Sequence, residues 1–160
     1  MKFVPRTPPK IPFTQTAFEE MRQNQARLTQ ELKEVMARLK VAREMGDLSE
    51  NGAYKYAKFE IGSIRRQLSK LNYLIKNGEI LAPNTNTKIV GFGSLVTVAS
   101  NTTAQPLKFR IVSTHEADPL EGKLSVDSPI GVALMNKKVG DTVEVQTPKA
   151  KINYTLLKIA

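Results

Sequence analysis

The chain has 160 residues, of which 41% are hydrophobic and 24% are charged, a composition typical of a soluble globular protein. Its 24 Lys and Arg residues outnumber 15 Asp and Glu residues, and the excess is spread along the whole chain. This charge favours a nucleic acid or an acidic protein as partner but specifies no site. The absence of Cys excludes disulfides and thiolate chemistry, and neither a membrane-length apolar run nor a signal-peptide core is present. We therefore expect a cytoplasmic protein.

The first segment, residues 1–12, is rich in proline and basic residues. These are Pro5, Pro8, Pro9 and Pro12, together with Lys2, Arg6 and Lys10. Prolines at this density exclude a helix and favour an extended chain. We expect a basic leader that either contacts a polyanion or is simply solvated.

Apolar residues then recur at alternating spacings of three and four over two stretches that flank residues 43–54. The first stretch contains Phe18, Met21, Leu28, Leu32, Val35, Leu39 and Ala42, with the polar Gln25 in register, and the second contains Tyr54, Ala57, Ile61, Ile64, Leu68, Leu71 and Ile75. A mean period of 3.5 is typical of supercoiled helices, and two such helices joined by a short turn pack antiparallel. Residues 13–79 are therefore predicted to form a coiled-coil hairpin.

Capping signals set the limits of the first of these helices. Thr14 or Thr16 is expected to begin it, since Thr16 and Glu19 have the spacing of a capping box. The helix should continue to about Met45.

The turn between the helices carries two carboxylates, Asp47 and Glu50, three residues apart. Hard oxygen ligands without a neighbouring His or Cys suit Mg²⁺, although two carboxylates leave an octahedral site incomplete. The spacing therefore indicates part of a metal site that a partner would complete. The same residues are also typical of a turn and a helix start, where Asp47 or Ser49 would cap the second helix.

The pattern changes after Asn77-Gly78, where the second helix is expected to end. Residues 80–90 read as a linker, and residues 91–160 as a second domain. Short strands are predicted at residues 94–98, 107–112, 142–145 and 152–157. A short helix should follow Ser128 as its cap, with Pro129 at its first position. The fold class is therefore α+β, with an antiparallel sheet and one short helix in the second domain.

Several separated motifs carry a family resemblance. Residues 42–51, Ala-Arg-Glu-Met-Gly-Asp-Leu-Ser-Glu-Asn, resemble the signature of the Gre transcript-cleavage factors of bacterial RNA polymerase, GreA type. Matching stretches of the second domain are residues 92–94, 111–112, 116–118, 128–134 and 139–141. The resemblance extends over about residues 11–160 in collinear order.

The resemblance implies a coiled coil that enters the polymerase secondary channel and an FKBP-like domain that docks at the channel rim. It implies a transcription elongation factor that stimulates the polymerase's own cleavage of backtracked nascent RNA and has no independent active site. Asp47 and Glu50 would share Mg²⁺ with the polymerase, with no cofactor bound to the factor alone, and Ser49 would orient the water or the RNA. A monomer without membrane contact is expected.

Further contact residues follow from the same resemblance. Residues expected to contact the 3′ end of the RNA or the channel wall are Arg43, Asn51, Lys55, Lys58, Arg65 and Arg66. Asp127, Ser128 and Pro129 match the loop that contacts the polymerase rim.

Three alternatives remain open. Gly52-Ala53 stands where the family commonly has Ala-Glu, which leaves room for a channel-binding regulator that inhibits without stimulating cleavage. An FKBP-like prolyl isomerase or chaperone would need an aromatic-lined pocket, for which the second half offers only Phe92, Phe109 and Tyr154. Binding of duplex DNA is suggested by the net charge alone, because the basic residues are dispersed along the chain.

Overall fold

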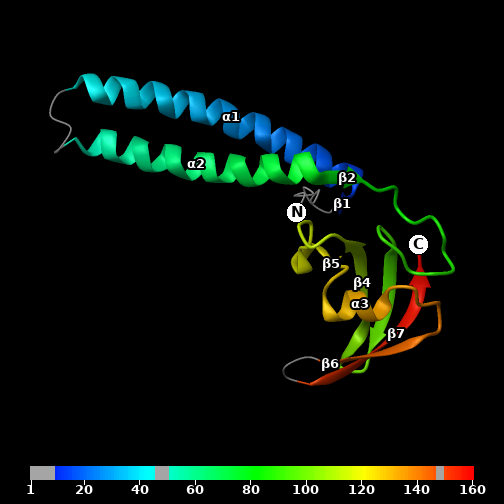
Figure 1. Cartoon of the computed structure of the whole chain (residues 1–160). Helices are drawn as coiled ribbons and strands as arrows, with labels where there is room; N and C mark the ends of the chain where they lie inside the picture. The colour runs from blue at the N-terminus through cyan, green and yellow to red at the C-terminus, as the bar shows by residue number, and fades with distance from the viewer. Residues whose placement is uncertain (1–9, 46–50, 147–149) are drawn as a thin grey trace, which may run out of the picture. The chain divides into compact units, whose positions relative to one another are not determined.

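The computed structural model describes residues 10–45, 51–146 and 150–160 and shows an α+β protein (Figure 1). The chain divides into two compact units. One contains Phe18–Gly78, and the other combines Ile11–Ala17 with Glu79–Ala160. The predicted fold class is confirmed, and each unit has its own hydrophobic core.

The first unit is a hairpin of two long helices, α1 (Gln15–Glu44) and α2 (Gly52–Asn77), which run antiparallel side by side (Figure 1). The buried residues between them are Leu28, Val35, Ala57, Ile61, Ile64 and Leu71, with Met21, Leu32, Leu39, Leu68 and Ile75 partly buried against this cluster. All of these occupy the alternating positions expected from the sequence. The coiled-coil prediction is confirmed.

Two polar pairs link the helices across the seam. Gln25 Nε2 donates a hydrogen bond of 2.6 Å to Asn72 Oδ1, so the one polar residue of the heptad pattern has a polar partner on the opposite helix. Arg38 Nη2 lies 3.0 Å from Glu60 Oε1. Because such pairs are satisfied in only one alignment of the helices, they help to fix the register of the hairpin.

The caps of the helices agree with the sequence at one end and differ at the other. Thr14 Oγ1 accepts a hydrogen bond from the Ala17 N–H at 3.3 Å, as expected for a cap before Gln15. The N-cap of α2 is Asn51, so the expectation of a cap at Asp47 or Ser49 is wrong. The Asn51 side chain accepts from the Tyr54 N–H, which starts the helix later than predicted.

A two-stranded sheet joins β1 (Ile11–Phe13) to β2 (Gly78–Ile80). Part of the proline-rich segment thus forms a strand, and Pro12 is compatible with it because a short edge strand tolerates a missing N–H. Gly78 has an extended backbone, with φ −73° and ψ 144°, and carries α2 directly into β2.

The C-terminal unit contains a five-stranded sheet with the order β5-β4-β3-β7-β6. Its strands are β3 (Leu95–Ser100), β4 (Thr103–Val112), β5 (Lys123–Ser125), β6 (Thr142–Gln146) and β7 (Lys151–Ile159), with a 3₁₀ turn, η1, at Pro119–Glu121. All neighbouring strands are antiparallel except β4 and β5, which are parallel. The expectation of a purely antiparallel sheet is therefore wrong at β5, because three residues are too few to show a strand pattern.

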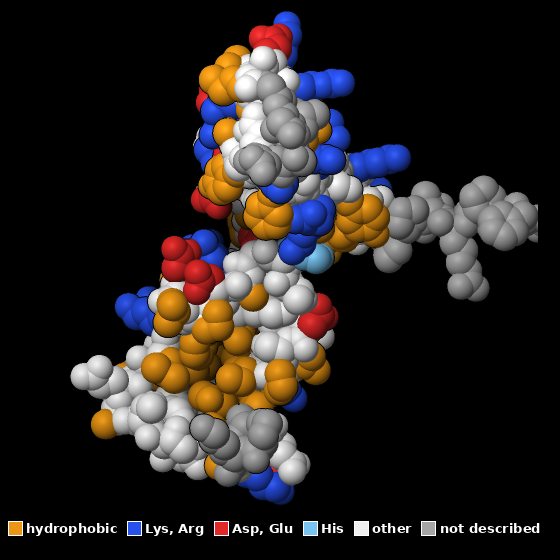
Figure 2. Space-filling model, turned by 90° about the vertical axis from the view of Figure 1, so that its left-hand side faces the viewer, with side chains coloured by type: hydrophobic (Ala, Val, Ile, Leu, Met, Phe, Trp, Pro, Cys, Tyr) orange, Lys and Arg blue, Asp and Glu red, His pale blue; other side chains and the backbone are white. Residues whose placement is uncertain are grey.

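Helix α3 (Pro129–Leu134) contacts both edge strands, β5 and β6, and covers the apolar face of the sheet. Its N-cap is Ser128 and its first residue is Pro129, as the sequence predicted. Figure 2 shows that apolar side chains gather around a hollow on one face of this unit. Among the residues that the structure describes, no helix is long and apolar enough to span a membrane.

Candidate functional site

The turn of the hairpin carries the acidic pair on which the functional hypothesis depends. Asp47, Ser49 and Glu50 lie outside the described residues, whereas both helix ends that flank them are described. Asn51 joins these ends: its Nδ2 donates to the Ala42 carbonyl oxygen at 2.6 Å, and its Oδ1 accepts from the Tyr54 N–H at 3.0 Å. One side chain therefore ties the last turn of α1 to the first turn of α2.

Sequence reasoning placed Asn51 among the RNA contacts and missed this bridging role. The capping half of this role was predictable from the sequence, because Asn is among the preferred N-cap residues. The hydrogen bond to Ala42 connects residues that are nine apart and lie on opposite sides of the turn, and no local sequence pattern predicts such a bond. Contact between Asn51 and RNA stays a prediction.

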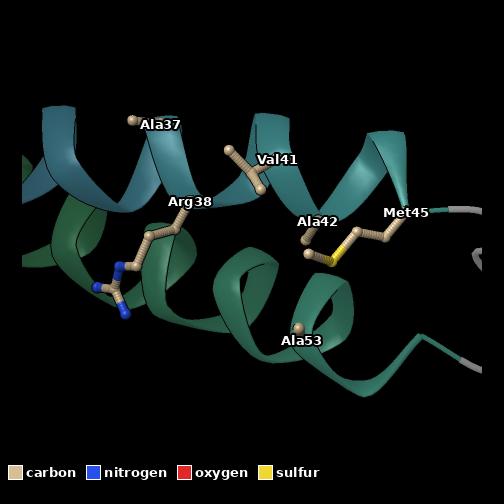
Figure 3. A pocket seen from close by; sticks show the side chains of 6 residues that line it. All are labelled: Ala37, Arg38, Val41, Ala42, Met45 and Ala53. Atoms are coloured by element: carbon tan, nitrogen blue, oxygen red, sulfur yellow. The ribbon is translucent and has the colours of Figure 1, made fainter.

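A shallow groove lies beside this end of the hairpin (Figure 3). It has a volume of about 420 Å³ and is lined by Ala37, Arg38, Val41, Ala42, Met45 and Ala53. Met45 is 74% exposed, and the guanidinium of Arg38 is engaged by Glu60. The lining contains no carboxylate, thiol, hydroxyl or imidazole, so the groove offers an apolar contact surface and no acid–base or nucleophilic group.

The turn carries the carboxylates that the sequence suggests as metal ligands. Within residues 10–45, 51–146 and 150–160, no group of three or more His, Cys, Asp or Glu side chains could hold a metal ion. The carboxylates of Asp47 and Glu50 are hard oxygen donors and suit Mg²⁺ in kind. They are too few to fill six positions, so the donor set fits a shared ion and not a complete site.

Basic side chains cover one solvent-facing side of α2 close to the turn. Lys55, Lys58, Arg65 and Arg66 are all exposed, and their spacing places them on one face of the helix. None of the four forms an ion pair with another described residue. Lys58 Nζ lies 5.8 Å from the centre of the Tyr54 ring, and Arg43 is exposed in the last turn of α1. The described helix ends that flank the turn therefore carry several exposed basic side chains, together with the exposed acid Glu44.

The predicted docking loop lies at the start of α3. Asp127 and Pro129 are exposed, and Thr114 Oγ1 donates a hydrogen bond of 2.5 Å to Asp127 Oδ2. Ser128 Oγ accepts from the Gly131 N–H at 3.0 Å and donates to the Ser125 carbonyl oxygen at 2.7 Å. The loop is thus fixed from both sides, with Asp127 and Pro129 available for contact.

Comparison with protein families accounts for nearly the whole described chain. Residues 11–80 match the family model "Transcription elongation factor, N-terminal", and residues 84–160 match "Transcription elongation factor, GreA/GreB, C-term". The chain belongs to the GreA/GreB family. The earlier resemblance is confirmed, and the protein is a Gre-family transcription elongation factor.

Two GreA proteins of similar sequence agree with this assignment. The chain is 39% identical to the transcription elongation factor GreA of Bacillus licheniformis over 152 residues, covering 94% of this chain and 96% of the relative. It is 40% identical to the GreA of Bacillus subtilis over 128 residues, covering 80% and 82%. A solved structure, the GreA factor homolog 1 (Gfh1) protein of Thermus thermophilus, matches at 27% identity with a TM-score of 0.44 and covers 94% of this chain and 99% of that one.

Proposed function

We propose that this Gre-family protein binds bacterial RNA polymerase and stimulates the polymerase's own cleavage of backtracked nascent RNA. The observation that supports this most directly is the long antiparallel hairpin, whose helix ends are tied together by Asn51 on either side of the Asp47–Glu50 turn. At 1.5 Å per residue, α1 with 30 residues is about 45 Å long and α2 with 26 residues is about 39 Å long. Such a rod can carry two carboxylates into a narrow channel.

In this proposal the chain contributes ligands and position, and the polymerase contributes the active centre. Asp47 and Glu50 would hold a Mg²⁺ ion whose remaining ligands come from the partner. In phosphoryl transfer such an ion neutralises developing charge and lowers the pKa of water. Ser49 would orient the attacking water or the RNA by hydrogen bonding. The factor would have no catalytic site of its own.

The other residues would fix the factor in place. Arg43, Lys55, Lys58, Arg65 and Arg66 would contact RNA phosphates or the channel wall. Their exposure supports this, as does the lack of ion pairs between them and other described residues. In the C-terminal unit, the exposed Asp127 and Pro129 beside the capping Ser128 would dock at the channel rim.

The alternative of an FKBP-like prolyl isomerase has little support in the structure. Tyr154, one of three aromatic residues available for its pocket, is only 6% exposed and packs in the core of the sheet.

Release of labelled 3′ RNA fragments from stalled, backtracked polymerase complexes tests the proposal. We expect wild type to accelerate release, and the Asp47→Ala/Glu50→Ala variant to be inactive. A matched control is Glu34→Ala/Glu44→Ala, which removes two exposed acids from α1 and should keep full activity. Equally slow release by wild type and the Asp47→Ala/Glu50→Ala variant would overturn the proposal. If, in addition to that result, wild type slowed elongation on complexes that are not backtracked, the alternative of a channel-binding regulator would replace the proposed cleavage function.

A further inference from the structure

Two large aromatic side chains face solvent on the second turn of α2. Phe59 is 71% exposed and Tyr56 is 66% exposed, three residues apart on the same side of the helix. Neither ring stacks on another aromatic ring or a cation among the residues that the structure describes. Their packing is therefore not needed for the hairpin, and paired exposed aromatics of this size indicate a contact surface.

Apart from Tyr56, the positions next to Phe59 on the helix surface are either cationic or small. Lys55 lies four residues before Phe59, and Gly62 and Ser63 follow it by three and four residues, which makes all three its neighbours on the helix surface. A Cβ added at Gly62 would lie 3.5 Å from Arg66 Nη1, so the guanidinium of Arg66 lies back over Gly62. Phe59 thus has the cation Lys55 among its helix-surface neighbours and a second cation, Arg66, over the adjacent Gly62, and no bulky side chain covers it in the following turn.

The acidic residue of this segment faces elsewhere. Glu60 is partly buried and points towards α1, where Arg38 Nη2 lies 3.0 Å from its Oε1. The solvent-facing side of α2 from Lys55 to Arg66 therefore combines flat apolar rings with uncompensated positive charge. A ligand that matches both features must carry planar apolar groups on an anionic backbone.

We propose that Tyr56 and Phe59 form a stacking platform for the unpaired bases of a single-stranded nucleic acid, with Lys55 and Arg66 contacting its phosphates. A duplex keeps its bases paired and stacked inside, and an acidic peptide offers charge without planar groups, so neither uses both features. Stacking on aromatic side chains beside a basic groove is how proteins bind single strands without sequence preference. Phe59 lies about 10 Å along α2 from its first residue, within reach of a strand that ends at the acidic turn. That the strand is RNA rests on the proposed function.

Binding of a fluorescent 12-nucleotide single strand to the free protein tests the platform by anisotropy, with RNA and DNA strands compared. We expect Tyr56→Ala/Phe59→Ala to bind about tenfold or more weakly than wild type. The Phe59→Trp variant should bind the strand with the affinity of wild type. The Phe59→Leu variant should bind it more weakly than wild type, because Leu keeps apolar area but has no flat ring. A strand without bases should bind wild type and the double variant equally. The control is Tyr73→Ala, which removes a 53% exposed aromatic from the far end of the same helix and should change nothing.

The platform is refuted if Tyr56→Ala/Phe59→Ala binds the strand like wild type, or if Tyr73→Ala weakens binding as much. It is equally refuted if Phe59→Leu binds like wild type, or if a duplex or polyglutamate binds more tightly than the single strand. The assay contains no polymerase, so its failure is distinguishable from failure of the proposed cleavage function. If only DNA strands bind, the result supports the stacking platform but contradicts its assignment to nascent RNA.

Discussion

At the scale of single residues, the side chain that closes the hairpin is the most informative. Asn51 uses its carbonyl to start α2 and its amide to bind the last turn of α1, so both hydrogen-bonding groups act within the chain. The Asn amide has its acceptor and its donor on separate atoms, and the side chain is short enough to cap the helix with the one while the other reaches Ala42. The sequence allowed a cap near this position, but the bridge required the two helices to be placed.

Replacing Asn51 by Ala is expected to lower the free energy of unfolding by about 1–2 kcal/mol, because the cap of α2 and the donor to Ala42 are both lost. Urea denaturation measures the change. Asn51→Ser serves as the matched control, since it keeps a capping acceptor for the Tyr54 N–H and should lose less. An Ala variant as stable as wild type would contradict the bridging role.

Glu116 joins the start of α1 to the loop after β4, and sequence patterns gave no sign of it. Its Oε1 accepts from the Thr14 N–H at 2.9 Å and from Ser113 Oγ at 3.1 Å, and its Oε2 accepts from Thr14 Oγ1 at 2.6 Å. Glu116→Ala removes all three bonds to a partly buried carboxylate and should destabilise the protein by about 2 kcal/mol. Thermal unfolding would show this, with the exposed Glu121→Ala as control; equal melting temperatures for the two variants would exclude the role.

At the scale of elements, long periodic segments were predictable and short ones were not. The heptads of α1 and α2 extend over many turns, so each apolar position supports the same face. The short helix α3 was predictable because Ser128-Pro129 is a strong start signal. By contrast, β5 has three residues and pairs in parallel with β4, and such a pairing depends on tertiary contacts that no local pattern contains.

Gly52 opens α2 and is expected to be a weak point of that helix. A Cβ added there would meet nothing within 4 Å, so the glycine is not needed for close packing. Gly52→Ala should raise the free energy of unfolding by roughly 0.5–1 kcal/mol, since Ala loses less backbone entropy. Chemical denaturation tests this, and a destabilised Ala variant would show that the turn requires glycine.

Gly131 shows the opposite case. It is buried in α3, and an added Cβ would collide with the carbonyl oxygen of Ser125 in β5. Gly131→Ala should therefore destabilise the C-terminal unit by about 1–3 kcal/mol, as expected for overpacking. The near-ultraviolet signal of Tyr154 in the sheet core can follow the unfolding of this unit. If the Gly131→Ala variant were as stable as wild type, α3 would be able to move away from Ser125 without any loss of stability, contrary to the prediction.

At the scale of the whole molecule, the chain joins a two-helix hairpin to an α+β unit, and the sequence indicated both. The acidic pair and the heptads suggested a carboxylate-bearing hairpin, and the family match establishes a Gre-type elongation factor. A contact role for the exposed aromatics Tyr56 and Phe59 was not predictable from the sequence, because they lie off the heptad seam. At such positions the residue type alone does not distinguish a solvated side chain from one that contacts a ligand. Their meaning depends on the cations placed around them.

The Mg²⁺ dependence of transcript cleavage tests the central claim most directly. Fragment release from a backtracked polymerase complex would be measured over a Mg²⁺ titration with wild type, Asp47→Ala/Glu50→Ala, or no factor. The account predicts that wild type lowers the Mg²⁺ concentration for half-maximal cleavage, and that the double variant leaves it at the value without factor. If wild type accelerates cleavage without shifting this midpoint, or the double variant shifts it equally, the carboxylate pair does not recruit the ion.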